Sequence, residues 1–235
     1  MKLKFSHIII FSVITSINIL PQSTDNKFSI SLNYNYTTTS KLYLQPNSSD
    51  PFLRNLYSEL EDIYSISTEF RFEIYEHLLI GLGSEFISKT FPNRNFNLGG
   101  NRIEIKDGFS VIPIELSLYY LLPFSSQQFK FFMGGGGGIY FGKHIREFGD
   151  VFFQDNGSQV GYGIHVGVGM EYFIKDYLSI RGQMRFRDPE FKMKSRYSNN
   201  IVNYSGNSYL ISTDSYNSKA NIDGVTFTIG AVLNF

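Results

Sequence analysis

The last twelve residues of the chain, Gly224 to Phe235, alternate apolar side chains with small or polar ones at a period of two. The apolar face consists of Val225, Phe227, Ile229, Ala231, Leu233 and Phe235. A period of two is that of a β-strand, because successive side chains of an extended chain point to opposite faces. The C-terminal segment is therefore predicted to be a strand whose two faces meet different surroundings.

The same alternation recurs along the whole chain. Eight such segments occur, at 27–38, 61–75, 78–89, 109–121, 129–142, 159–173, 178–187 and 224–235. Three short turns, near Glu76, Pro123 and Asp176, alternate with four long connections. The long connections are 39–60, 90–108, 143–158 and 188–220, and they hold many turn-forming residues. Because no segment keeps its apolar residues at helical spacing, we expect an all-β fold of eight antiparallel strands.

Two segments depart from a regular strand pattern. Pro113 lacks the N–H group that a ladder needs, so the fourth strand is expected to be irregular there. Gly134 to Gly138 are consecutive glycines within the fifth strand. A phosphate-binding loop is one reading of this run, but no Lys-Ser or Lys-Thr pair and no helical pattern follow it. We expect instead that the strand bends there or faces bulky groups from its neighbours.

The N-terminus has the pattern of an export signal. Lys2 and Lys4 precede a mostly apolar run from Ile8 to Leu20, which is shorter than the roughly 20 residues of a spanning helix. We therefore expect a cleaved signal peptide over residues 1–23, with its boundary between 20 and 26, and a mature domain over 27–235. A retained anchor helix is the alternative. No later run is long enough for a membrane helix, so membrane insertion would have to use strands.

Composition excludes several classes of protein. Lys and Arg together number 21, as do Asp and Glu, so the chain has no net charge that would favour nucleic acid. The chain has no Cys, which excludes disulfides, thiolate zinc sites and a lipid anchor on an N-terminal Cys. It has 23 Phe, 16 Tyr and 21 Gly, a bias that suits strands packing rings on one face. We expect no metal site and no cofactor.

The charged residues of the strands gather on the face opposite the aromatic and aliphatic side chains. They are Glu69, Arg71, Glu73, Glu85, Glu115, Lys130, His165, Glu171, Arg181, Arg185 and Arg187. On a soluble, lipocalin-like barrel they would lie outside and leave more Phe, Tyr, Ile and Leu than eight strands can enclose. Turned inward, they form a structural network of compensated charges. The turn near Asp176 places Glu171 opposite Arg181 as one pair of this network.

The alternating strands, the short and long connections and the terminal Phe235 resemble the small eight-stranded outer-membrane β-barrels of the OmpA and OmpX type. The resemblance covers the mature chain, but no periplasmic domain follows the barrel and the glycine run matches no pattern of that family. It implies the outer membrane of a Gram-negative bacterium, short periplasmic turns and long extracellular loops. It also implies outer-membrane lipids as surroundings, and Phe235 as the signal read by the barrel assembly machinery. We expect a monomer.

For function we expect a structural or surface-interaction role, either adhesion or recognition, through the extracellular loops. Residues 201–204 and 209–212 are β-prone and flank Ser205-Gly206-Asn207, which predicts a hairpin that exposes Tyr204 and Tyr209 to an unknown extracellular ligand. A solvated loop without a partner is the plainer reading. A narrow, porin-like channel is the alternative function.

An enzyme is the least favoured reading. A lipid-modifying deacylase would need a His-X-Ser pair, whereas His144 is followed by Ile145 and Arg146, and His165 by Val166 and Gly167. Glu69 and Glu85 are candidates for a catalytic acid and base. Charges of both signs fill the same space, however, which favours a structural salt-bridge network. We therefore expect no catalytic residue.

Overall fold

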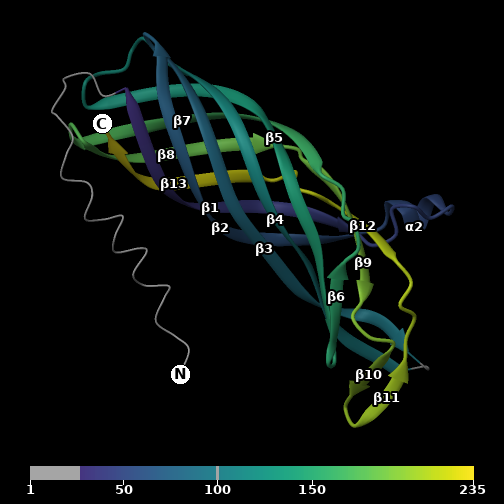
Figure 1. Ribbon diagram of the computed structural model, residues 1–235. Helices are drawn as coiled ribbons and strands as arrows, with labels where there is room; N and C mark the ends of the chain where they lie inside the picture. Colours follow the sequence, from purple (N-terminus) through teal and green to yellow (C-terminus); the bar gives the residue numbers. More distant parts are fainter. Residues whose placement is uncertain (1–26, 99–100) are drawn as a thin grey trace, which may run out of the picture.

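The computed structural model describes residues 27–98 and 101–235, so the predicted signal peptide lies outside the described residues. Most of the described chain is β-strand (Figure 1). The strands are β1 (Phe28–Tyr43), β2 (Tyr57–Tyr75), β3 (Leu78–Leu98), β4 (Asn101–Leu121), β5 (Phe129–Phe148), β6 (Val151–Asp155), β7 (Gly161–Lys175), β8 (Leu178–Arg187), β9 (Glu190–Tyr197), β10 (Ile201–Tyr204), β11 (Asn207–Leu210), β12 (Tyr216–Asn221) and β13 (Val225–Asn234). One short helix, α2 (Pro51–Asn55), follows β1. No helix of the described residues is long and apolar enough to cross a membrane.

The strand pairings return to their starting point. β1 pairs antiparallel with both β2 and β13. Between them, antiparallel ladders join β2 to β3, β3 to β4, β4 to β5, β5 to β7, β7 to β8 and β8 to β13. Eight strands of the described chain thus form a ring of pairings, and each overlaps one of the predicted segments. The predicted all-β antiparallel fold is confirmed.

The predicted count of eight strands is incomplete, because the described residues form thirteen. Most of the long connections are strands and not loops. β3 continues to Leu98 and β4 begins at Asn101, so even Pro92 stands in a ladder, opposite Lys106. At this end β6, β9 and β12 add further pairings between β5 and β1. Strand pairing satisfies the backbone hydrogen-bonding groups of these segments, and a composition rich in turn formers does not reveal such pairing.

The two ends of the ring differ. The short turns lie at one end, the turn end, where the backbone of Phe235 also pairs with that of Phe28. At the other end, β6, β9 to β12 and the far tips of β3, β4 and β5 form a projecting part, here called the lobe. Figure 1 shows the lobe bending away from the ring, with α2 projecting beside it.

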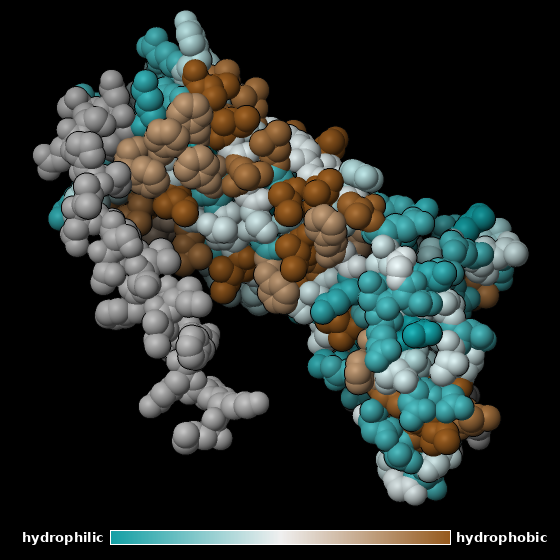
Figure 2. Space-filling model, in the orientation of Figure 1, coloured by the Kyte–Doolittle hydropathy of each residue, from teal (hydrophilic) through white to brown (hydrophobic). Residues whose placement is uncertain are grey.

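Side chains are distributed inside out relative to a soluble protein. Apolar side chains cover the outside of the ring in a belt, which includes Leu32, Tyr64, Leu82, Leu116, Tyr162, Ile164, Ile180 and Ile229. Ile164 is 73% exposed, whereas Arg181, on the inner face, is 2% exposed. Figure 2 shows hydrophobic residues over the ring and mostly hydrophilic ones over the lobe. Exposing so many apolar side chains to water would cost free energy, so the belt needs an apolar environment.

The glycine run lines the wall between β4 and β5. A Cβ at Gly136 would lie 1.9 Å from the carbonyl oxygen of Leu116, and one at Gly134 would lie 2.5 Å from the ring of Tyr119. A Cβ at Gly138 would lie 2.7 Å from the side chain of Glu115. The expected crowding by bulky neighbouring groups is observed at Gly134 and Gly138, whereas at Gly136 the backbone of β4 is the crowding group. At Pro113 the ladder to β3 is interrupted between the pairs Ser84–Ile114 and Ile87–Val111, as predicted.

Candidate functional site

The interior of the ring near the turn end holds a charge cluster centred on Glu69. This carboxylate accepts from Arg71 at 2.8 Å and from Arg181 at 3.1 Å, and Tyr119 Oη donates to it at 2.7 Å. Arg181 also binds Glu171 at 2.9 Å, and these two residues are register partners on β7 and β8. The guanidinium of Arg71 lies 3.7 Å from the centre of the Tyr119 ring, a cation–π contact. The cluster thus has two carboxylates and two guanidinium groups.

A second cluster lies further along the interior. Glu85 accepts from Arg185 at 2.9 Å and from Arg187 at 2.7 Å. Glu115 accepts from Arg185 and from the hydroxyl of Tyr140. Both clusters are electrically balanced, which is the condition for charges to remain ionised away from water. Glu69 and Glu85 lie in different clusters, and each is held by two arginines.

Three of the predicted network residues take other positions. Glu73 lies at the turn end, where its carboxylate accepts from the backbone N–H of His77 at 3.3 Å. Lys130 stands opposite Glu171 in register, but its Nζ lies 4.9 Å from the centre of the Phe173 ring. His165 is buried at the edge of the second cluster, with Nε2 2.8 Å from Ser117 Oγ. Glu73 and Lys130 thus lie away from the two charge clusters, because strand alternation gives a side chain's face and not its depth.

Little space remains between these side chains. The polar cavity bounded by both clusters has a volume of about 30 Å³, close to that of one water molecule. It is lined by Asn33, Asn35, Ser67, Thr68, Glu69, Gly83, Ser84, Glu85, Glu115, Ser117, Tyr119, Gln183, Arg185 and Thr228.

An apolar layer closes the interior on the side of the lobe. Phe191 and Met193 of β9 are buried among side chains of β1 to β5 and β12. The other members of this layer, here called the plug, are Leu42, Leu60, Ile63, Ile87, Phe109, Val111, Tyr140, Ala220 and Ile222. Phe191 meets Phe109 edge to face at 5.8 Å. Along the axis of the ring, the balanced charges are therefore followed by a buried apolar layer.

Beyond the plug, inside the lobe, lies a buried polar group that sequence reasoning missed. Asp107 accepts from Arg146 and from His144 Nε2, each at 2.6 Å, and from Asn93 at 3.1 Å. Ser218 Oγ lies 3.0 Å from His144 Nδ1. The available signal was the spacing of His144 and Arg146, which puts both on one face of a strand.

This lobe group lies outside the belt, because the outward neighbours Lys106, Lys143 and Glu147 are charged and exposed. Burial raises the pKa of Asp107, but the hydrogen bond from His144 and the charge of Arg146 bring that pKa well below its ordinary value. Burial lowers the pKa of His144 despite the bond to Asp107. His144 is thus a neutral imidazole that donates to Asp107 and accepts from Ser218.

The order Ser218, His144, Asp107 has the connectivity of a nucleophilic relay, but two observations oppose catalysis. Ser218 is 1% exposed, so a substrate has no access to its oxygen. Arg146 already neutralises Asp107, the carboxylate that would stabilise a positively charged imidazole in such a relay. Among the described residues, no group of three or more His, Asp or Glu side chains is arranged to hold a metal ion.

The predicted hairpin of the last long connection is present. β10 and β11 pair from Ile201–Leu210 to Tyr204–Asn207 around Ser205 and Gly206, both at positive φ. The exposure expected of Tyr204 is wrong: its side chain is half-buried, and its ring lies 5.4 Å from that of Phe148. Tyr209 is also half-buried, whereas Leu210 is 77% exposed and Phe52 of α2 is 73% exposed. The hairpin packs down onto a core because Val202 and Ile211 are buried in the lobe.

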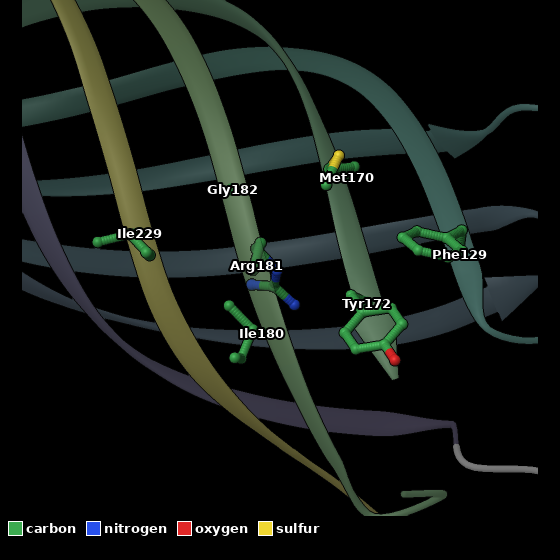
Figure 3. A pocket seen from close by; sticks show the side chains of 7 residues that line it. All are labelled: Phe129, Met170, Tyr172, Ile180, Arg181, Gly182 and Ile229. Carbon is green, nitrogen blue, oxygen red and sulfur yellow. The ribbon is translucent and has the colours of Figure 1, made fainter. Parts of the chain in front are cut away.

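An apolar hollow lies on the outside of the ring. It measures about 400 Å³ and is bordered by Phe129, Met170, Tyr172, Ile180, Arg181, Gly182 and Ile229 (Figure 3). It exists because Gly182 has no side chain, and a Cβ there would touch nothing within 4 Å. The hollow belongs to the apolar belt and offers no convergent polar groups, so it lacks the features of a specific ligand site.

Comparison with known proteins supports the fold. No protein-family model matches the sequence, and no curated protein matches it. A solved structure that resembles the chain is the outer membrane protein OprG from Pseudomonas aeruginosa, with a TM-score of 0.58, 12% identity, and coverage of 89% of this chain and 96% of that one. Neisserial surface protein A (NspA) has a TM-score of 0.48 and 13% identity, over 88% of this chain and 97% of that one. The likeness to OprG shows that the chain has the all-β fold of an outer-membrane β-barrel protein.

Proposed function

We propose that the protein is a sealed outer-membrane barrel of eight strands, which holds the folded lobe at the cell surface for recognition or adhesion. The barrel consists of β1, β2, β3, β4, β5, β7, β8 and β13. The observation that carries the proposal is the combination of an occupied interior with an ordered lobe. Such a protein acts through the surface it presents and not through transport or catalysis.

The sealing follows from energetics. Removing one partner of a buried ion pair typically costs about 3–5 kcal/mol, so opening the two charge clusters to make a path is unfavourable. The plug adds a second barrier, because Phe191 and Met193 are both about 1% exposed and lie in an apolar layer. An ion crossing this layer would lose its hydration without gaining a partner. These features favour a closed barrel over the porin-like alternative.

The lobe supports a surface role because it is built as a structure with its own core. Ile103, Ile105, Phe148, Val151, Phe153, Tyr197, Val202 and Ile211 are buried together there. Rings of Phe153 and Tyr197 meet at 4.6 Å, and Tyr216 packs on both. An ordered surface loses less conformational entropy on binding a partner than a flexible loop does. The extracellular ligand would therefore meet a preformed surface.

The orientation follows the usual arrangement of such barrels. Short turns face the periplasm and long segments face the exterior, so the turn end and Phe235 belong on the periplasmic side and the lobe on the cell surface. The apolar belt contacts the outer-membrane lipids. Export by a cleaved signal peptide, insertion by the barrel assembly machinery and a monomeric state belong to the same proposal.

The sealing is tested by electrical recording in planar bilayers. The wild-type protein should give no discrete conductance steps. The variant Phe191→Ala with Met193→Ala thins the plug and should remain closed because the charge clusters persist, whereas adding Arg185→Ala should produce intermittent steps. Conductance steps in the wild-type protein, with a different size in the single variant Arg185→Ala, would contradict the sealed barrel and favour the porin-like channel.

Insertion as a barrel is tested on a denaturing gel. The folded protein should migrate differently before and after boiling, and it should resist extraction from membranes by carbonate. A protein that migrates as an unfolded chain without heating and is extracted by carbonate would contradict the membrane barrel.

A further inference from the structure

The outward face of β9 carries three cations in succession. Its inward residues Phe191, Met193, Ser195 and Tyr197 are buried, and the alternating outward residues Lys192, Lys194 and Arg196 are exposed. Alternate residues of a strand are about 7 Å apart, so the three charges form a row about 14 Å long. This row is here called the cation ladder.

Several other cations on the outside of the lobe are held by carboxylates. Lys41 binds Asp223 at 2.5 Å, Lys106 binds Glu147 at 3.2 Å, and Lys219 binds Glu190 at 3.0 Å. No such ion pair joins a residue of the ladder to another residue of the described chain. Glu190, on the same face of β9, is paired with Lys219, so the three charges of the row have no carboxylate partner among the described residues.

The neighbouring strand adds a further cation to this face. Lys192 stands directly opposite Lys219 in the pairing of β9 with β12. Like charges in opposite positions destabilise a sheet. The ammonium of Lys219 is held over the Tyr43 ring, 4.4 Å from its centre, so Lys219 remains on this face beside the ladder. Glu190 offsets part of the charge of Lys219, and an anion bound beside Lys192 would offset the remaining repulsion.

The position of β9 indicates which anion is within reach. Glu190, its first residue, pairs with Tyr162 of the belt, and the carbonyl of Lys192 accepts from the N–H of Gln159. Tyr162 is 72% exposed, with its neighbour Ile164 in the same belt. Lys192 therefore lies one alternation beyond the edge of the belt. Lys194 and Arg196 extend from there toward the lobe.

We propose that the cation ladder and Lys219 bind the phosphate groups on the saccharide headgroup of an anionic glycolipid of the surrounding outer leaflet. The inference rests on the proposed membrane placement. Lysines act as point charges toward phosphate, and the guanidinium of Arg196 donates two parallel hydrogen bonds to one phosphate group. Bound in this way, the glycolipid anchors the lobe against the membrane surface.

The test uses the full-length protein in nanodiscs of phosphatidylcholine, to which purified lipopolysaccharide is added as the probe. The ladder variant combines K192Q, K194Q and R196Q. The matched control combines K89Q, K106Q and K143Q, which removes the same charge from β3, β4 and β5 of the same end. We expect the ladder variant to bind lipopolysaccharide on the order of 100-fold more weakly, and the control within threefold of wild type. Binding by wild type should also weaken as salt is raised.

Two further arms identify the ligand. Enzymatically dephosphorylated lipopolysaccharide should bind wild type as weakly as intact lipopolysaccharide binds the ladder variant. Equal binding of intact and dephosphorylated lipopolysaccharide, or equal weakening in ladder variant and control, would overturn the proposal. Tight wild-type binding of a soluble sulfated polysaccharide together with poor binding of lipopolysaccharide would assign the ladder to an extracellular polymer. Heat-dependent gel migration of the same variants separates a failure of this proposal from a failure of membrane insertion.

Discussion

Glu171 on β7 and Arg181 on β8 are directly opposite each other in the pairing of these two strands, and Arg181 Nη2 lies 2.9 Å from Glu171 Oε2. Both are buried, and Arg181 is also 3.1 Å from Glu69. We expect Glu171→Ala to lower the free energy of unfolding by about 3 kcal/mol, the lower end for a broken buried pair, because Glu69 still compensates Arg181. Adding Arg181→Ala should recover part of this loss. Urea titration of the detergent-refolded protein measures both effects.

The exposed Glu76→Ala is the control for this cycle and should change stability by less than about 0.5 kcal/mol. Strictly additive losses for Glu171→Ala and Arg181→Ala would mean that the two side chains do not interact.

Glycines in the wall of the ring should differ sharply in their tolerance of a methyl group. Gly136→Ala would place its Cβ against the backbone of β4, so we expect a loss of about 2 kcal/mol or more from overpacking. Gly182→Ala faces open space on the belt and should be neutral or stabilising by up to about 1 kcal/mol. The two variants are controls for each other in one urea titration. Equal effects would show that close approach of β4 and β5 does not explain the glycine run.

Lowering the pH should destabilise the lobe before it destabilises the ring. Burial holds the pKa of His144 below its ordinary value of 6.5, so the unfolded lobe binds a proton more readily than the folded one. The stability contributed by neutral His144 is thus fully present above pH 6.5 and declines as the pH falls below it. Amide hydrogen exchange in β6, β9 and β12, corrected for intrinsic rates, should accelerate between pH 7 and pH 5.5.

His144→Gln keeps a donor toward Asp107 and an acceptor for Ser218 but does not titrate. It should remove the acceleration, while amides of β8 serve as an internal reference. Asp107 does not contribute in this range, because its pKa lies well below its ordinary value. An unchanged pH dependence in His144→Gln would assign the effect to another group.

Phe235 should matter more for assembly than for stability. Its backbone exchanges two hydrogen bonds of 2.9 Å with Phe28, which any residue can make, and its ring is partly exposed 6.2 Å from that of Phe28. Phe235→Ala should therefore refold in detergent with nearly unchanged stability, yet yield severalfold less heat-modifiable protein in cell membranes. Leu233→Ala, on the same face, is the control. Similar losses in both assays would mean that the ring acts by packing.

Much of the ring follows from local pattern. Alternation at a period of two predicts strands such as β7 and β8 because it depends only on which side chains are neighbours in sequence. The tight turn near Asp176 then fixes the register of Glu171 with Arg181. The hairpin of β10 and β11 was predictable for the same reason, since Gly206 takes the positive φ that a two-residue turn requires.

Only the tertiary structure decided what fills and covers the ring. Asp107, His144 and Ser218 come from three distant segments, and they meet because β4 pairs with β5 while β9 and β12 close the lobe. The same closure carries Phe191 into the plug and leaves Lys192 outside it. The sequence by itself determined the strands and the two faces of each, because these depend on neighbouring residues. The depth of each side chain and its long-range partners depended on ring closure, which brings together residues that no local pattern relates.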